Sequence, residues 1–225
     1  MVPRSLACHF RSTKIFFARA VATVDSQRRL CIVRVVIQID VQEFKIKELK
    51  LIIPKRFSDA RGYFQETWSD RVYRDALGQV DFVQDNLSLS LRKGTLRGLH
   101  FQRPPCAQGK LVRVGRGSIF DVAVDIRKGS PTYGQHVGIT LDAEAGAQFW
   151  VPPGFLHGFC TLEDNTEVCY KATSYYSPAH DAGVAWNDPD LGIKWPIDTG
   201  SVILSEKDER LPRLRELPSL FGDKS

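Results

Sequence analysis

The sequence predicts an all-β protein, built as an antiparallel barrel or jelly roll, and three observations support this. From Phe44 onward, short runs of alternating or β-branched residues follow one another along the chain. Clusters of Gly, Pro, Asp and Asn separate the runs. Only one stretch in this region carries clear signals for a helix. Many short strands divided by turn residues are typical of barrels and jelly rolls, which commonly have about eight strands.

The elements can be assigned in chain order. The expected strands cover residues 49–53, 82–91, 95–102, 110–114, 118–126, 135–141, 147–151, 158–162 and 166–173. The expected helix covers residues 69–78, because Ser69 can cap its beginning and Gly78 can end it. The tail from Trp186 is rich in proline and charge. We expect it to wrap around the barrel as turns and short peripheral helices.

The charge is unevenly distributed, which divides the chain into an extension and a body. The net charge is +5, but residues 1–50 hold 10 Lys/Arg and 4 Asp/Glu, and the remainder holds 21 and 22. The body is therefore nearly neutral, and we expect no nucleic-acid partner. Residues 1–24 contain no acidic residue, as in some targeting peptides, although an upstream extension is the simpler interpretation. We expect residues 1–43 to lie outside the barrel and residues 44–225 to form it.

Membrane and redox signals place the protein in the cytoplasm. The apolar run at residues 30–37 is too short to span a bilayer, so we expect no membrane association. As a strand, residues 32–37 could pair with a neighbouring sheet edge. The five cysteines form no CxxC pair and leave one over. A disulfide framework or a zinc ribbon is therefore not expected, and a reducing compartment fits best.

Polar side chains concentrate on two of the expected strands. Residues 82–86 place Gln84, Asp85 and Asn86 together, and residues 96–102 carry Arg97, His100 and Gln102. Strict alternation cannot put the last three on one face, so we expect a bulge at Gly98. Arg, His, Lys and Tyr side chains inside a barrel are costly to bury unless they hold a polar, anionic ligand.

Eight segments resemble one family in their order and spacing. They are residues 59–66, 82–86, 96–102, 108–113, 120–128, 152–159, 170–178 and 186–188. Together they are similar to the dTDP-4-dehydrorhamnose 3,5-epimerases, over the chain from about Phe44 to its end. The resemblance implies a cupin-type jelly roll and a homodimer. It also implies a dTDP-4-keto-6-deoxyhexose substrate, inverted at C3 and C5 without a cofactor.

The resemblance also implies roles for individual residues. His100 matches the base, Asp208 its carboxylate partner, Tyr170 the acid, and Lys110 the cation near the C4 oxygen. Taken singly, His100 would more simply be a strand histidine, Tyr170 a surface tyrosine and Lys110 a solvated lysine. The implied substrate-binding positions are Arg61, Glu66, Gln84, Asp85, Asn86, Arg97, His157, Asp181, Lys207 and Tyr176.

At some of these positions the residue type supports the implied role more strongly than at others. Arg97 and Lys207 suit a diphosphate by charge. Asp181 departs from the family pattern, which often has Glu there. Tyr176 and Trp186 could face the sugar or base, or could belong to the core.

Alternative functions remain open at this point. A single-site epimerase, acting at C3 or at C5 only, would share the same catalytic residues. An isomerase that moves the ketone is a weaker alternative, and a non-catalytic sugar-nucleotide-binding module would need to lack the base or the acid. A metal site is not expected, because Gln102 occupies the position where a metal-binding cupin offers its second ligand.

Overall fold

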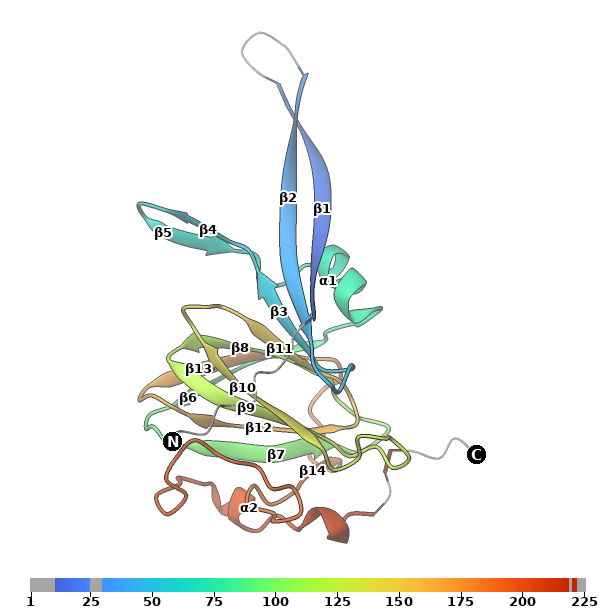
Figure 1. Ribbon diagram of the computed structural model, residues 1–225, viewed down its shortest axis with the longest axis vertical. Coiled ribbons are helices and arrows are strands. Elements are labelled where there is room, and N and C mark those ends of the chain that lie inside the picture. The colour runs from blue at the N-terminus through green and yellow to red at the C-terminus, as the bar shows by residue number, and fades with distance from the viewer. Residues whose placement is uncertain (1–10, 25–29, 219, 222–225) are drawn as a thin grey trace, which may run out of the picture.

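Two antiparallel sheets face each other and form the body of the protein (Figure 1). The computed structural model describes residues 11–24, 30–218 and 220–221, with side chains described from Ile39 onward. The jelly-roll prediction is confirmed by this architecture and by the related structures reported below.

The larger sheet has seven strands in the order β1 (Arg11–Val24), β2 (Leu30–Glu43), β3 (Lys50–Pro54), β11 (Gln148–Val151), β8 (Lys110–Arg116), β13 (Thr166–Ala172) and β6 (Gln84–Ser90). The smaller sheet has five, in the order β10 (His136–Asp142), β9 (Ser118–Asp125), β12 (Phe155–Thr161), β7 (Leu96–Gln102) and β14 (Asp181–Gly183). A separate hairpin consists of β4 (Arg56–Asp59) and β5 (Gly62–Gln65). Three short helices are peripheral: α1 (Asp70–Leu77), α2 (Glu206–Glu209) and the 3₁₀ turn η1 (Leu214–Glu216).

Each of the nine expected strands overlaps a strand of the structure. The helix prediction is also correct, since Ser69 is the N-cap of α1 and Gly78 ends it with a φ of 77°. Ser69 makes no side-chain capping hydrogen bond, however, so its part in starting the helix is only conformational. The hairpin β4–β5 and the short β14 had no strand signal of their own, because pairing and not periodicity defines such short strands.

The larger sheet extends upstream of the expected barrel boundary. Ile39–Glu43 of β2 pair antiparallel with β3. Ile39 and Val41 are buried and pack in one cluster with Val72 and Tyr73 of α1. The strands β1 and β2, which lie within the expected extension, therefore belong to this sheet. That the remainder of residues 1–43 lies outside the barrel stays a prediction.

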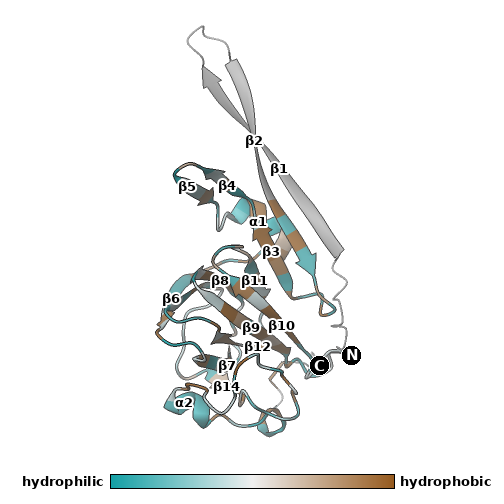
Figure 2. Ribbon diagram, turned by 60° about the vertical axis from the view of Figure 1, so that its left-hand side comes forward, coloured by the Kyte–Doolittle hydropathy of each residue, from teal (hydrophilic) through white to brown (hydrophobic). Residues whose placement is uncertain are grey.

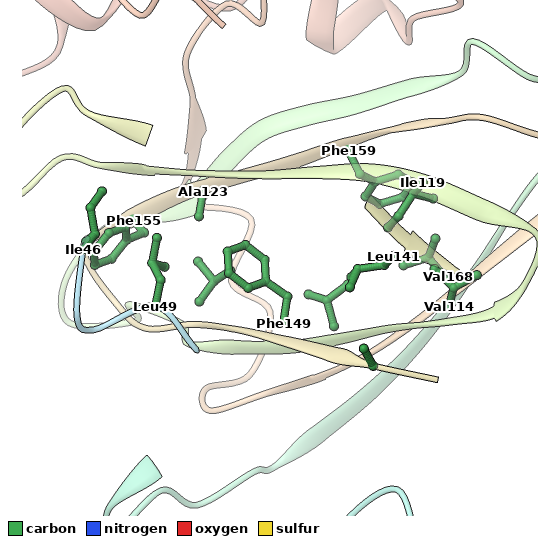
Figure 3. Close-up of a cluster of buried hydrophobic side chains, with 13 residues drawn as sticks. Ile46, Leu49, Val114, Ile119, Ala123, Leu141, Phe149, Phe155, Phe159 and Val168 are labelled. Atoms are coloured by element: carbon green, nitrogen blue, oxygen red, sulfur yellow. The ribbon is translucent and has the colours of Figure 1, made fainter. Parts of the chain in front are cut away.

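The main core lies between the two sheets. Figure 3 shows Phe149 of β11 opposite Ala123 of β9, with Phe155 and Phe159 of β12 on either side. Each of these phenylalanine side chains contributes about 1.5–3 kcal/mol when fully buried. In Figure 2 the strands β8 and β9 carry hydrophobic colouring, whereas α2 on the outside is hydrophilic.

A second core covers the outer face of the five-stranded sheet. The C-terminal segment, residues 186–221, contributes Trp186, Leu191, Trp195 and Leu214 to it. Trp186 is 9% exposed, and its carbonyl accepts a hydrogen bond from Trp195 Nε1 at 3.0 Å. Trp186 is therefore a core residue, the second of the two roles that the sequence left open for it.

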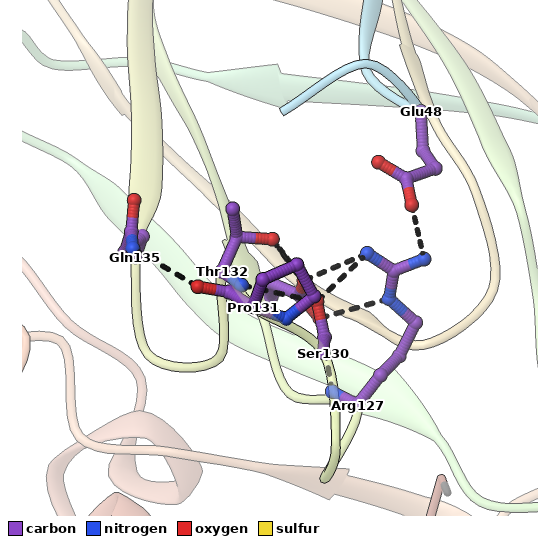
Figure 4. A network of polar contacts seen from close by, with 7 residues as sticks. Glu48, Arg127, Ser130, Pro131, Thr132 and Gln135 are labelled. Carbon is purple, nitrogen blue, oxygen red and sulfur yellow. Dashed lines mark hydrogen bonds and ion pairs between the residues drawn. The ribbon is translucent and has the colours of Figure 1, made fainter. Parts of the chain in front are cut away.

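A polar network closes one end of the barrel (Figure 4). The fully buried Asp125 bonds the Arg127 guanidinium at 2.7 Å and the Ser130 and Thr132 hydroxyls at 2.6 Å each. Burial alone would raise the pKa of Asp125, but these hydrogen bonds lower it to about 2. Arg127 also bonds Glu48 at 2.7 Å, which links the end of β9 to the segment before β3.

The strand β7 has an extra residue, as predicted at Gly98. Along β12, His157 pairs with His100 and Phe159 pairs with Arg97, so two steps on β12 match three on β7. Gly98 lies within this irregularity and has a φ of 127°. As a result Leu99 packs into the outer core while Arg97 and His100 both line the interior.

In the described part of the chain, no helix is both long and apolar enough to cross a membrane.

Candidate active site

A cavity of about 410 Å³ opens between the two sheets near the C-terminal segment. Seven of the predicted site residues line it: Arg97, His100, Lys110, His157, Tyr170, Lys207 and Asp208. They come from four strands and α2. The structure therefore gathers most of the predicted charged and aromatic groups in one place.

His100 and Asp208 form a hydrogen-bonded pair in this cavity. His100 Nε2 lies 2.6 Å from Asp208 Oδ1, and the carboxylate is 4% exposed. Burial would raise the pKa of Asp208, but the hydrogen bond and charge of His100 hold it below its usual value. An ionised carboxylate on Nε2 favours the tautomer with the proton on that nitrogen. Nδ1 is then free to accept a proton from a ligand.

The local fold of α2 presents Asp208 to His100. Ser205 caps this helix by accepting a hydrogen bond from the Asp208 backbone N–H at 3.2 Å. The segment before it is fixed by Ile203, whose backbone exchanges hydrogen bonds with Gly94 and Leu96. A residue 108 positions away in sequence is thus held against the base.

A second histidine–carboxylate pair lies beside the first. His157 Nε2 is 2.7 Å from Asp121 Oδ1, and both residues are almost fully buried. The other oxygen, Asp121 Oδ2, is buried without a hydrogen-bond partner among the described residues. His157 and His100 are register partners on adjacent strands, so the two imidazoles enter the cavity side by side.

Tyr170 and Lys110 approach from the opposite sheet. They lie on the neighbouring strands β13 and β8, with Lys110 Nζ 5.9 Å from the Tyr170 ring centroid. Burial raises the pKa of Tyr170, so the phenol stays protonated at neutral pH. Burial lowers the pKa of Lys110 to about 8, although Asp181 and Asp121 partly oppose the shift. The cavity thus holds a base on one wall and a proton donor on the other.

A polar cluster adjoins the cavity at Lys207, and this region is called the mouth of the cavity below. Asp181 Oδ2 accepts hydrogen bonds from Lys207 Nζ and, at 3.1 Å, from the Tyr176 hydroxyl. Tyr176 is 56% exposed, which leaves its ring accessible to a ligand. Gln84 Oε1 holds the Tyr176 backbone N–H at 2.9 Å, and Gln84 Nε2 donates to Asn86 Oδ1. These predicted residues position one another.

Three predicted residues lie away from the cavity. Asp85 pairs with Lys171 on the outer side of β6, because successive residues of a strand point to opposite faces. Arg61 lies at the turn of the hairpin β4–β5, bonded to Asp59 and with its side chain 89% exposed. Glu66 follows that hairpin, and its Oε1 is buried without a partner among the described residues. Within one chain these three do not join the site.

Comparison with known proteins identifies the family. The family model for dTDP-4-dehydrorhamnose 3,5-epimerase matches residues 43–216. The chain belongs to the dTDP-4-dehydrorhamnose 3,5-epimerase family. The enzyme of that name from Sinorhizobium fredii is 54% identical over 180 residues, which are 80% of this chain and 92% of that protein.

Two further relatives bear on the site. The crystal structure of dTDP-6-deoxy-D-glucose-3,5-epimerase from Legionella pneumophila, in complex with dTDP-4-keto-L-rhamnose, is 44% identical with a TM-score of 0.79. The alignment covers 83% of this chain and 100% of that one. A dTDP-4-dehydrorhamnose 3-epimerase from Streptomyces niveus is 40% identical over 70% of this chain and 75% of that protein. The family thus includes proteins named for one epimerised carbon and for two.

In this epimerase-family chain, sequence reasoning missed Asp121, which is bonded to His157 beside the cavity, and Ser88, which lines the cavity. Asp121 is the only charged residue between Ile119 and Ala123 of a buried strand, and that isolation is a signal the sequence offered. Ser88 lines the cavity, and its hydroxyl is buried without a partner among the described residues. A serine on an alternating strand gives no such signal.

The epimerase-family site also shows what Gln102 does. Its carboxamide donates to the carbonyls of Cys106 and Tyr175 and accepts from the Ser177 N–H at 2.7 Å. Gln102 therefore ties two loops together instead of offering a ligand. Among the residues that the structure describes, no three His, Cys, Asp or Glu side chains are grouped to hold a metal ion. That the enzyme needs no metal or cofactor stays a prediction.

Proposed function

We propose that this protein converts dTDP-4-dehydro-6-deoxy-D-glucose to dTDP-4-dehydro-L-rhamnose by inverting C3 and C5. The observation that carries the proposal is the placement of two groups in one cavity. The His100–Asp208 pair projects from the five-stranded sheet, and Tyr170 projects from the seven-stranded sheet opposite. Family membership adds the substrate class.

The chemistry follows from the position of the ketone. The protons at C3 and C5 both lie next to the C4 carbonyl, so removing either one gives an enolate. His100 Nδ1 takes the proton, and Asp208 stabilises the imidazolium that forms. The Lys110 ammonium offsets the developing charge on the C4 oxygen. Tyr170 then returns a proton to the opposite face of the carbon, which inverts it.

Binding of the nucleotide is assigned to the mouth of the cavity. Arg97 and Lys207 supply positive charge for the diphosphate, since both line the opening. Tyr176 offers an exposed ring on which the thymine base can stack. Gln84, Asn86 and Asp181 hold this surface in place. His157 faces the sugar beside His100.

We further propose that the protein is a homodimer. Arg61 and Glu66 match family positions that contact substrate, yet neither lines the cavity of its own chain. Arg61 lies at the turn of the hairpin β4–β5, which projects away from the two sheets in Figure 1. Tyr63 and Phe64 on this hairpin are 59% and 69% exposed. Leu87, Leu89 and Leu91 form a further exposed apolar row at the edge strand β6. A second copy that covers these surfaces would bring the hairpin residues to a partner's site.

The test is solvent exchange in D₂O. Purified protein is incubated with dTDP-4-dehydro-6-deoxy-D-glucose, and deuterium is located by NMR and counted by mass spectrometry. A 3,5-epimerase incorporates deuterium at C3 and C5. Incorporation at one carbon only would support the single-site alternative, for which the Streptomyces niveus 3-epimerase is the precedent. No incorporation would leave a sugar-nucleotide-binding module.

A further inference from the structure

Two glycines on adjacent strands lie back to back beside the base. A Cβ atom on Gly98 of β7 would lie 2.6 Å from the Cα of Gly158 in β12 and 2.9 Å from the carbonyl oxygen of His157. A Cβ atom on Gly158 would lie 2.8 Å from the carbonyl oxygen of Arg97 and 3.1 Å from the Cα of Gly98. These neighbours are backbone atoms, which cannot rotate away as a flexible side chain can.

The extra residue of β7 lies at this contact. Between the pairs His157–His100 and Phe159–Arg97, Gly158 alone faces both Gly98 and Leu99. Without the extra residue, Arg97 and His100 would point to opposite faces of the sheet, because they are three positions apart. The bulge turns both into the cavity and sends Leu99 into the outer core.

The same bulge also touches the partner of the base. The Gly98 backbone N–H points to Asp208 Oδ2 at 3.4 Å, while Asp208 Oδ1 lies 2.6 Å from His100 Nε2. The position of the bulged backbone therefore decides where both members of the pair stand relative to each other.

We infer that Gly158 is a positioning residue for the His100–Asp208 pair: its missing Cβ leaves the room in which the β7 bulge aims Arg97 and His100 at the substrate. This inference rests on the proposed function, which makes His100 the base. Gly158 does not have the positive φ that favours glycine. An alanine at this position therefore tests space and not backbone strain.

The test is Gly158→Ala. A small displacement of a catalytic group can cost on the order of 100-fold in rate, so we expect kcat to fall by about 10- to 100-fold. The acid limb of the kcat profile should move along the pH axis, because the geometry between His100 and Asp208 would change. The NMR signal of the His100 ring proton shared with Asp208 should shift or disappear. Binding of dTDP should change little, since the charged groups at the mouth remain.

Gly138→Ala is the matched control. It lies on β10 of the same sheet, and its Cβ would meet ring carbons of Phe120 at 2.4–3.2 Å, away from the cavity. We expect a comparable loss of Tm with unchanged kcat and pH profile. If Gly158→Ala fails to fold, Gly183→Ala on β14 presses the bulge from its other side, where a Cβ would lie 2.4 Å from the Leu99 carbonyl oxygen.

The outcomes separate this inference from the proposed function. Wild-type kcat, pH profile and His100 signal in a folded Gly158→Ala or Gly183→Ala protein would overturn the inference. Equal losses of kcat in Gly138→Ala would also overturn it, because the effect would then be general destabilisation. An inactive wild-type protein would instead refute the proposed function, and the His100 signal would still report on the positioning of the pair.

Discussion

Replacing Lys110 by methionine should stabilise the protein and slow the reaction at the same time. The ammonium of Lys110 lies in the cavity, 5.9 Å from the centroid of the Tyr170 ring. Burial lowers the pKa of Lys110 from 10.5 to about 8. A shift of that size corresponds to about 3 kcal/mol of unfavourable free energy for the charged form at neutral pH. Methionine has a similar length and no charge, so it should recover part of this free energy. The recovery is incomplete, because Asp181 and Asp121 lose a neighbouring cation.

The pH dependence has a definite sign. Between about pH 8 and pH 10.5 the unfolded chain holds a proton on Lys110 that the folded protein has lost. The wild-type free energy of unfolding therefore gains a contribution that rises with pH through this window. The advantage of Lys110→Met should be largest below about pH 8 and should vanish near pH 10.5. Meanwhile kcat should fall by about 10²–10³, as for the loss of one group that stabilises an oxyanion.

Urea unfolding at both ends of this window, together with steady-state kinetics, measures both effects. Lys171→Met is the matched control, since Lys171 pairs with Asp85 on the outer face of the same sheet. That exposed pair should contribute little to stability and nothing to turnover. A Lys110→Met protein that is less stable than wild type near neutral pH, or that keeps full kcat, would refute the reasoning.

Three further predictions concern the base, the acid and the barrel end. His100→Ala should abolish deuterium exchange at both C3 and C5 while dTDP still binds by calorimetry, because one base serves both carbons; robust exchange at either carbon would contradict this. Tyr170→Phe should slow epimerisation much more than exchange, because the enolate is then reprotonated on its original face; equal losses would make Tyr170 structural. Asp125→Ala should lower the free energy of unfolding by about 3–5 kcal/mol, because it leaves Arg127 without its buried partner. The folded fraction of that variant should keep wild-type kcat. A loss of less than about 1 kcal/mol in the free energy of unfolding would show that the network in Figure 4 does not stabilise the fold.

Local patterns in the sequence were enough for the elements and for one irregular feature. Alternation placed the nine strands, and the turn residues between them set the approximate ends. The polar residues Arg97, His100 and Gln102 required a bulge at Gly98, and the register of β7 against β12 has one. These features depend on neighbours in the chain, so the sequence contains their cause. The assignment of Tyr170 and Asp208 came from family resemblance and not from periodicity.

Tertiary packing decided the rest, because it depends on residues far apart in the chain. Only the folded chain brings Asp121 to His157, 36 positions away, and shows that Gly158 faces the bulge. Pairing with β3 joins β2, and through it β1, to the larger sheet, and hydrophobic periodicity gives no signal of which edge a strand joins. The sequence motif that contains Arg61 lies on the hairpin β4–β5, and Arg61 is not among the residues that line the cavity. The spacing of residues along a strand determines which face of the sheet a side chain occupies. The packing of the two sheets against each other determines which residues that side chain contacts.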